Sequence, residues 1–321
     1  GIAFQEKAMS DAGSSGKYYL AGETVEDWRA IGLRNLWTVE DTVQLLKTGQ
    51  NRFATVSGNM AEVIHHSTQH FTDGDLTAIA SYLKSLPAGK DDLPMPMVAS
   101  EPAIAPDSLF SSRGGLGYTQ FCADCHRPDG GGVKGMFPPL NGNPGIIAAN
   151  PASLLHITLT GWATPQTEAH PRVYRMPGFA RLSDGEIAEI LSFVRSSWGN
   201  QASAISPAQV AAMRKQLNPQ TIDATAFETP RLAGLLSASN ADQVLRGMRL
   251  HLQTKALLPD NVGNALNCTS CHLNAGTVAD GSPFVGVSAF FPGYAPRAGK
   301  EVTLEERING CFRRSMNGQP L

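Results

Sequence analysis

Two copies of the pattern Cys-x-x-Cys-His carry the clearest chemistry in this chain: Cys122-Ala-Asp-Cys125-His126 and Cys268-Thr-Ser-Cys271-His272. Two thiols spaced in this way can each form a thioether bond with a vinyl group of haem. The histidine that follows them then lies under the ring, where it serves as the proximal ligand of the iron. The pattern therefore predicts two covalently attached c-type haems on this chain.

Two other uses of paired cysteines are disfavoured by the sequence. A structural zinc site needs two more Cys or His nearby in a compatible pattern, and the chain has five cysteines in all. A thioredoxin-like redox pair needs a strand-helix-strand context and no following histidine, and neither motif is set in such a context. Haem attachment remains the favoured reading of both motifs.

The bulk composition bounds the class of protein. With 321 residues the chain is long enough for two or three domains, and its net charge of -2 gives no hint of a nucleic acid partner. No stretch reaches the about 18 apolar residues that a membrane span requires. Haem attachment to such motifs occurs, in bacteria, outside the cytoplasmic membrane, so a periplasmic location is expected. The start at Gly1 without a leader and the abrupt end at Leu321 predict a piece of a longer protein.

An internal repeat organises the first two hundred residues. Residues 72–86 align without a gap with residues 183–197, and both segments begin with a Thr or Ser followed three residues later by an acid. That arrangement predicts a capped helix start, and the apolar residues that follow recur at helical spacing. The repeat indicates one fold used twice. The two copies are separated by a proline-rich linker, Pro87 to Pro106, which is expected to be extended.

Each repeated helix is preceded by a methionine, Met60 and Met176, as in the C-terminal half of a small cytochrome c. Three further runs carry a more specific resemblance: Trp37-Thr-Val-Glu-Asp-Thr, Gly58-Asn-Met60-Ala-Glu-Val and Met176-Pro-Gly-Phe179 with Ser197-Trp-Gly-Asn200. Residues 1–200 thus resemble the cytochrome c subunits of membrane-bound alcohol and aldehyde dehydrogenases. In this resemblance a loop methionine is the sixth iron ligand, a role that falls on Met176 and, in the first copy, on Met60.

The first copy, residues 1–90, lacks its own attachment motif because no cysteine precedes Cys122. Its haem is either attached to residues upstream of Gly1, giving a third haem in a longer protein, or lost. His65, His66 and His70 are expected to be surface or capping residues.

The second copy, residues 107–200, holds a complete His/Met set, with His126 as the fifth ligand and Met176 as the sixth. Met136, His156 and His170 are the competing sixth ligands. Met176 is preferred because it matches the family motif and precedes the terminal helix by a short loop. Met136 follows His126 too soon to reach the opposite face of the ring.

The third segment, residues 201–321, is not another copy. From Asn261-Val-Gly-Asn264 through the second motif and Phe291-Pro-Gly-Tyr294 to Glu305-Glu-Arg-Ile-Asn-Gly-Cys311, it resembles the catalytic haem domain of thiosulfate dehydrogenases, which form tetrathionate. The resemblance covers about residues 230–321. It implies His272 and the Cys311 thiolate as iron ligands, with Arg297 and Arg307 in the substrate pocket.

Alternatives remain open for the third segment. Cys311 could be a small buried hydrophobe, the commonest role of a free cysteine, and Met316 is another candidate ligand. The expected helix 304–314 places Arg307 on the same face as Cys311. Guanidinium groups suit thiosulfate because they offset the repulsion between two dianions. The family normally has a second haem domain after the catalytic one, so the third segment is expected to be truncated.

The sequence thus predicts a mainly α protein of tandem cytochrome c-like haem domains with two covalent haems c. Its expected work is electron transfer with a redox partner protein, and oxidation of thiosulfate to tetrathionate, or the reverse, at the His272/Cys311 haem. The alternative is a subunit without catalysis that relays electrons from a periplasmic dehydrogenase to the respiratory chain. No nucleic acid partner and no membrane span are expected.

Overall fold

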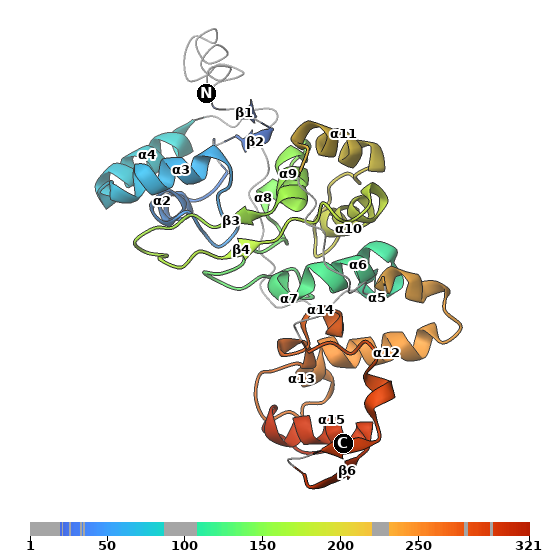
Figure 1. Cartoon of the computed structure of the whole chain (residues 1–321). Coiled ribbons are helices and arrows are strands. Elements are labelled where there is room, and N and C mark those ends of the chain that lie inside the picture. The colour runs from blue at the N-terminus through green and yellow to red at the C-terminus, as the bar shows by residue number, and fades with distance from the viewer. Residues whose placement is uncertain are drawn as a thin grey trace. The chain divides into compact units, whose positions relative to one another are not determined.

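The structure is a computed structural model that describes residue 20 and residues 22–25, 27–32, 34, 36–86, 108–219, 231–278, 282–295 and 298–321. Its described part consists mainly of short helices, with three two-stranded antiparallel ribbons (Figure 1). The predicted mainly helical class is thereby confirmed. The expected linker at 87–106 and Arg297 lie outside the described residues. In the described ranges, no helix combines the length and apolar character that crossing a membrane requires.

Contacts divide the chain into two compact units. Unit 1 comprises Gly1–Pro106 and Cys125–Asp223, and unit 2 comprises Asp107–Asp124 and Ala224–Leu321. The division falls inside the first haem motif, after Asp124. The three domains predicted from the sequence stay a prediction, since these units rest on contacts among the described residues.

The first segment of unit 1 contains a β-ribbon and a small helical group. Its elements are β1 (Gly22–Val25), β2 (Trp28–Ile31), α2 (Val39–Thr48), α3 (Asn59–His66), the 3-10 turn η1 (Thr68–His70) and α4 (Asp73–Ser85). The helices enclose an apolar cluster of buried side chains, of which each Leu, Val, Ile or Phe stabilises the fold by about 1.5–3 kcal/mol. Its members are Leu36, Trp37, Leu45, Phe53, Val56, Ala61 and Ile64.

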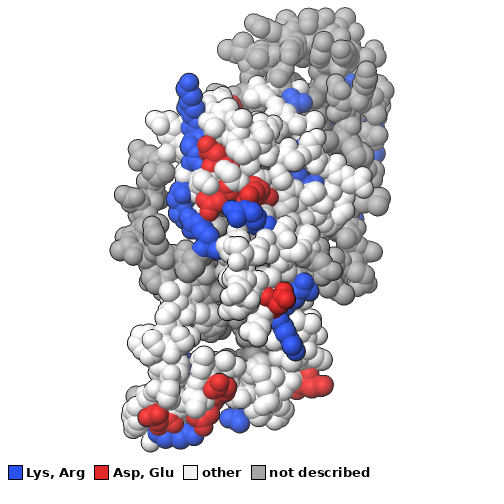
Figure 2. Space-filling view, turned by 90° about the vertical axis from the view of Figure 1, so that its right-hand side faces the viewer, with Lys and Arg blue, Asp and Glu red and all other residues white. Residues whose placement is uncertain are grey.

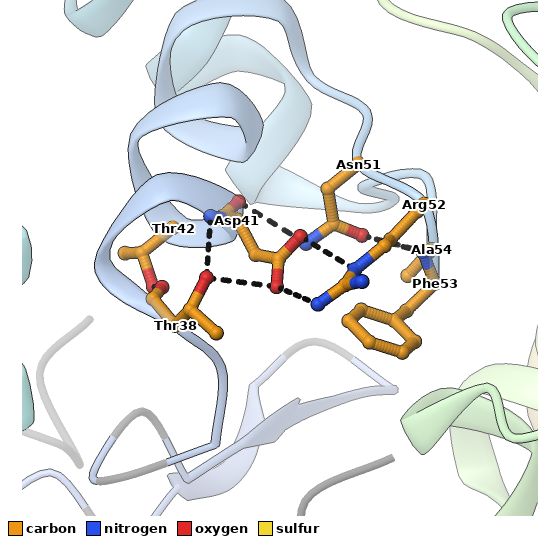
Figure 3. A network of polar contacts seen from close by, with 7 residues as sticks. All are labelled: Thr38, Asp41, Thr42, Asn51, Arg52, Phe53 and Ala54. Carbon is orange, nitrogen blue, oxygen red and sulfur yellow. Dashed lines mark hydrogen bonds and ion pairs between the residues drawn. The ribbon is translucent and has the colours of Figure 1, made fainter. Parts of the chain in front are cut away.

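A polar network fixes the start of α2 against the loop that follows it (Figure 3). Thr38 Oγ1 accepts a hydrogen bond from the Asp41 N–H at 3.1 Å and so caps the helix. Arg52 donates two hydrogen bonds, of 3.0 and 2.9 Å, to the Asp41 carboxylate. Asn51 Oδ1 accepts the N–H groups of Phe53 and Ala54. The bidentate ion pair explains how a carboxylate can be buried here.

The second segment of unit 1 contains the second copy of the repeat. Its elements are α8 (Pro144–Ile147), α9 (Ala152–Thr160), β3 (Trp162–Ala163), β4 (Arg175–Met176), α10 (Asp184–Ser196) and α11 (Pro207–Leu217). It packs against the first segment, where Trp28 stacks on His156 with 4.0 Å between ring centroids. The Arg29 N–H donates to Ser153 Oγ at 2.7 Å.

The two repeated helices, α4 and α10, begin as predicted. Thr72 and Ser183 are their N-caps. At α10 the Ser183 N–H also donates to the Glu186 carboxylate at 2.9 Å, which completes a capping box. At α4 the shorter Asp75 instead accepts the Thr72 hydroxyl at 2.7 Å. Both copies of the repeat therefore share the N-cap, and only α10 has the second hydrogen bond of the capping box.

Unit 2 is assembled around the second haem motif. Its elements are α5 (Ser108–Ser111), α6 (Arg113–Phe121), η2 (Leu232–Ser237), α12 (Ala241–Leu252), α13 (Thr254–Leu257), η3 (Cys268–Ser270), α14 (Leu273–Gly276), η4 (Val287–Phe290), β5 (Gly293–Ala295), β6 (Lys300–Val302) and α15 (Leu304–Arg314). Helix α6 packs against η2 and α14. Gly115 permits a close turn from α5 into α6, since a Cβ there would lie 2.3 Å from the Ser108 carbonyl oxygen. The short α7 (Ala123–His126) spans the division between the units.

On the face that Figure 2 shows, neither positive nor negative side chains form a continuous patch among the described residues. Lys and Arg atoms lie next to Asp and Glu atoms there, as the small net charge suggests. Electrostatic steering of an extended polyanion needs a continuous basic patch. Within the described residues, this face gives no support to such a role.

Candidate haem sites

The first motif presents a histidine prepared for metal ligation. The His126 side chain is buried, and its Nδ1 lies 3.0 Å from the Pro138 carbonyl oxygen. That contact selects the tautomer in which Nδ1 carries the proton and Nε2 is free to bind a metal. Burial lowers the pKa of His126, which favours the neutral imidazole that ligates iron. These features fit the proximal ligand of a haem.

Two glycines let the loop after His126 fold back so that Pro138 reaches the histidine. Gly130 and Gly132 have φ values of 65° and 63°, where side chains are disfavoured. A Cβ at Gly130 would lie 2.6 Å from the Trp198 ring, and one at Gly132 would lie 2.4 Å from the Phe137 carbonyl oxygen.

Residues that directly follow α10 hold this loop in place. Trp198 Nε1 donates to the Pro128 carbonyl oxygen at 3.1 Å. Asn200 accepts the Gly142 N–H at 2.9 Å and donates to the Leu140 carbonyl oxygen at 3.0 Å. We call Trp198 and Asn200 the loop clasp. The Ser-Trp-Gly-Asn run that suggested a family resemblance thus has a defined structural task.

Met176 lies in β4, opposite Trp162 of β3, and is half-buried. Gly161 and Gly178 allow the chain to pass close beside it, because a Cβ at Gly161 would lie 2.6 Å from the Met176 carbonyl oxygen. The Trp162 Nε1 atom is buried and has no hydrogen-bond partner in the described part of the chain. A buried donor without an acceptor fits a site that a bound group completes.

The competing sixth ligands lie in different settings. The His156 ring stacks on the Trp28 ring. Met136 and His170 are half-buried residues of loops. The assignment of Met176 stays a prediction.

Met60, in α3, packs against the apolar cluster of the first segment. His65, His66 and His70 are exposed, as predicted. All three make surface contacts: His65 Nδ1 lies 2.6 Å from the Gln166 carbonyl oxygen, His66 Nε2 lies 3.1 Å from Glu62, and His70 Nδ1 lies 4.0 Å from Glu168.

A residue of α13, Thr254, makes two hydrogen bonds to Cys268 of the second motif. Thr254 Oγ1 accepts the Cys268 N–H at 3.0 Å and donates to Cys268 Sγ at 3.3 Å. Burial raises the pKa of the Cys268 thiol, so it is kept protonated before any thioether forms. His272 is half-buried and its Nδ1 lies 2.6 Å from the Ser282 carbonyl oxygen. As at His126, a backbone carbonyl selects the tautomer with a free Nε2.

Unit 2 exposes several large apolar side chains, and one of them, Phe284, lies 4.3 Å from the His272 ring, centroid to centroid. A contiguous apolar surface is typical of a site for a ligand or a partner. The exposed apolar residues include Leu257, Leu266, Leu273, Phe284, Val285 and Phe290. A haem is a large apolar ring, so this surface fits the group that the motif implies.

Helix α15 brings Cys311 toward the second motif, and its bounds confirm the predicted helix. Arg307 Nη1 lies 3.5 Å from Cys311 Sγ, so the two side chains share a face as expected. Cys268 packs against a cluster that contains Phe312 and Met316, and burial and, to a smaller extent, the nearby Cys311 raise the pKa of the Cys268 thiol. Met316 is buried in that cluster, where it fills core volume. Arg297 lies outside the described residues.

Three residues of these sites escaped the sequence reasoning. Thr254 binds Cys268 across a distant stretch of chain, and Asp124 contacts the residues after His272. His251 lies 6.0 Å from the His272 ring, centroid to centroid, and its Nε2 atom is buried without a partner among the described residues. Burial lowers the pKa of His251 to about 4, so it is neutral near pH 7.

The described side chains show no group of three or more His, Cys, Asp or Glu that could hold a metal ion by itself. The cysteines of both motifs are free of disulfides. Each motif therefore offers two thiols and one histidine, the donor set of covalent haem attachment.

Haem load is the first expected outcome. The chain matured in a host that attaches c-type haem should carry two haems that acid-acetone extraction does not remove, because thioether bonds hold them. Intact-mass spectrometry measures this directly. One haem would mean that one motif is not used, and three would mean an attachment site that neither motif supplies.

Comparison with known proteins supports this reading. The cytochrome c family model matches residues 111–198. The cytochrome c subunit of a quinone-dependent alcohol dehydrogenase from Gluconacetobacter polyoxogenes is 38% identical over 231 residues, which is 67% of this chain and 48% of that protein. A thiosulfate dehydrogenase from Allochromatium vinosum is 40% identical over 124 residues, covering 37% of this chain and 46% of that protein. Both expected resemblances are thus confirmed.

The chain spans about half the length of the curated relatives it matches. Among solved structures, a thiosulfate dehydrogenase from Marichromatium purpuratum aligns with 90% of this chain and 54% of its own, at 23% identity and a TM-score of 0.41. A TM-score this low bears on neither site.

Proposed function

With a cytochrome c domain at residues 111–198 as the premise, we propose that this chain is a multihaem c-type cytochrome that oxidises thiosulfate to tetrathionate. The reaction takes place at the second motif, with His272 and Cys311 as the iron ligands. The electrons then leave through the haem of the cytochrome c domain to a redox partner protein. The proposed setting is the periplasm.

The observation that carries the proposal is the pairing of Arg307 with Cys311, at 3.5 Å on one face of α15. A haem that only relays electrons needs neither a cysteine beside it nor a cation beside that cysteine. A thiosulfate-oxidising haem needs both in the proposed chemistry. The similarity to thiosulfate dehydrogenases adds support from sequence.

The residues divide the work as follows. A haem held by Cys268, Cys271 and His272, with Cys311 as the other proposed iron ligand, would accept electrons one at a time. Two thiosulfate dianions would each give up one electron, both electrons would pass in turn to the redox partner protein, and a bond would form between the terminal sulfur atoms without any proton transfer. Arg307 donates charge-assisted hydrogen bonds to sulfonate oxygens and offsets the repulsion between the dianions. Arg297 is proposed for the same task.

The Arg307→Ala variant tests the anion role. We expect its KM for thiosulfate to rise about tenfold or more, because a lost hydrogen bond to a charged group costs about 1.5–3 kcal/mol. The spectrum of the resting protein should stay nearly the same, since Arg307 neighbours the proposed ligand Cys311 but is not itself an iron ligand. Steady-state reduction of a chemical electron acceptor measures KM.

The Arg313→Ala variant is the matched control, because Arg313 is an exposed arginine of the same helix. An unchanged KM in Arg307→Ala, or an equal rise in Arg313→Ala, would argue against an anion pocket at Arg307.

A second candidate function is a relay of electrons from a dehydrogenase without catalysis. It is favoured by the 38% identity to a dehydrogenase cytochrome c subunit over two thirds of the chain. Reduction of the purified holoprotein by thiosulfate alone separates the two candidates. A relay would be reduced by a dehydrogenase and its substrate, and not by thiosulfate.

A further inference from the structure

The end of helix α15 is joined to the segment that precedes the second haem motif. The Gly263 N–H donates to the Met316 carbonyl oxygen at 2.9 Å, and Asn264 Nδ2 donates to the Ser315 carbonyl oxygen at 3.0 Å. All four residues belong to unit 2. Backbone and side-chain hydrogen bonds thus hold residues 261–264 against the end of this helix.

Two glycines make this contact possible through the close approach of two backbones. A Cβ at Gly263 would lie 1.8 Å from the Asn317 carbonyl oxygen, and a Cβ at Gly318 would lie 1.9 Å from the Asn261 carbonyl oxygen. Neither position has room for a side chain, so glycine is required at both. The two segments are therefore packed backbone against backbone, which fixes the place of α15 beside the second motif.

Asn264 also reaches the second motif itself. Its Oδ1 accepts the Leu266 N–H at 3.1 Å, and Leu266 stands two positions before Cys268. Its Nδ2 is bound to Ser315, whose own N–H donates to the Cys311 carbonyl oxygen at 2.8 Å. One amide side chain therefore bridges the segment that leads into a haem-attachment cysteine and the helix turn that carries Cys311.

The bridge lies at the part of α15 that is most prone to open. Cys311 is in the last turn of the helix, where the final carbonyl groups have no partner within the helix and the ends fray. Asn264 gives a donor to the carbonyl oxygen of Ser315, the C-cap residue. An iron ligand has to be held within about 0.5 Å of its productive geometry, so fraying of this turn would weaken ligation.

We propose that Asn264 is a positioning residue that keeps Cys311 at the iron of the haem held by Cys268, Cys271 and His272. This inference rests on the proposed function, because it takes Cys311 as the iron ligand. The thiolate competes with any small ligand for the same coordination position. Loosening the helix turn should therefore help such a ligand to displace Cys311.

Imidazole titration of the ferric holoprotein tests the proposal without thiosulfate. Electron paramagnetic resonance detects the thiolate-ligated haem, and the loss of its signal with added imidazole gives an apparent Kd. In Asn264→Ala this Kd should fall about threefold to tenfold, the range expected from the loss of a single hydrogen bond. The near-infrared band of the other haem reports separately on displacement of Met176.

Two further variants make the test specific. Asn264→Asp keeps the oxygen that accepts the Leu266 N–H but has no N–H to donate to Ser315, so its Kd should fall as in Asn264→Ala. Asn261→Ala is the matched control, because Asn261 Nδ2 donates to the Pro320 carbonyl oxygen at 2.9 Å, beyond the end of α15. Its thermal stability should fall about as much as that of Asn264→Ala, while its Kd should stay unchanged.

Three results would overturn the proposal. The first is an Asn264→Ala protein with two haems and the wild-type Kd. The second is an equal fall of the Kd in Asn261→Ala, since a general loosening of the chain end would then explain both. The third is a wild-type protein without a thiolate signal, which would refute Cys311 as the iron ligand and the inference with it.

Two further outcomes are decided in advance. If Asn264→Ala does not mature, the Kd of Asn264→Asp takes its place, and a wild-type value there would overturn the proposal. A protein that shows the thiolate signal and the expected fall in Kd, but is not reduced by thiosulfate, would support the role of Asn264 and refute the proposed enzyme.

Discussion

Replacing Cys311 with glycine should abolish reduction of the protein by thiosulfate while both haems stay attached. An axial thiolate stabilises ferric iron, so its loss should raise the potential of one haem by on the order of 0.1 V, within the roughly 0.8 V that axial ligands span. The second haem should keep its potential. Spectroelectrochemical titration measures both potentials, and stopped-flow absorbance measures reduction by thiosulfate.

Controls separate ligation from folding. Glycine inside α15 costs about 1 kcal/mol of helix stability, so Cys311→Ala should be measured beside it. Met316→Leu tests the other candidate ligand, a buried residue of the neighbouring cluster, and should change neither potential. Normal thiosulfate turnover in Cys311→Gly would refute the proposed reaction at the His272/Cys311 haem, and the relay of electrons would remain as the function.

Replacing Met176 with alanine should remove the sixth ligand of the haem held by Cys122, Cys125 and His126. The near-infrared charge-transfer band of methionine-ligated ferric haem should disappear, and the potential of that haem should fall, because a thioether favours ferrous iron. The other haem should keep its spectrum. Near-infrared absorption and magnetic circular dichroism are the measurements.

Met136→Ala is the matched control, since Met136 is a half-buried loop methionine of the same cytochrome c domain. Its band should persist. If the band persists in Met176→Ala and disappears in Met136→Ala, the sixth ligand has been assigned to the wrong methionine. If the near-infrared band persists in both variants, Met60 would be the next methionine to replace.

Features set by local sequence were predictable. The helix Leu304–Arg314 begins at a threonine cap and has the predicted bounds, and its four-residue spacing places Arg307 beside Cys311. The N-caps of α4 and α10 follow from the same short-range rules. A hydroxyl that accepts the backbone N–H three residues later needs no information from the rest of the chain.

Features set by packing were not predictable. The contact of Asp124 with Asn274 depends on how α6 meets α14, and no periodicity in either segment encodes it. Left-handed Ala275 contradicts its own backbone preference and is held there by its surroundings. The division inside the first motif also follows from tertiary contacts, because α6 has η2 and α14 as neighbours.

The loop clasp links the opening of the first haem site to the unfolding of a distant helix end. Trp198 and Asn200 directly follow α10 and bind the backbone of residues 128–142, so they tie the loop around His126 to the segment that ends this helix. Loop and helix end should therefore open as one cooperative unit. The amide proton of Gly142, held by Asn200, would exchange with solvent at the rate of that shared opening.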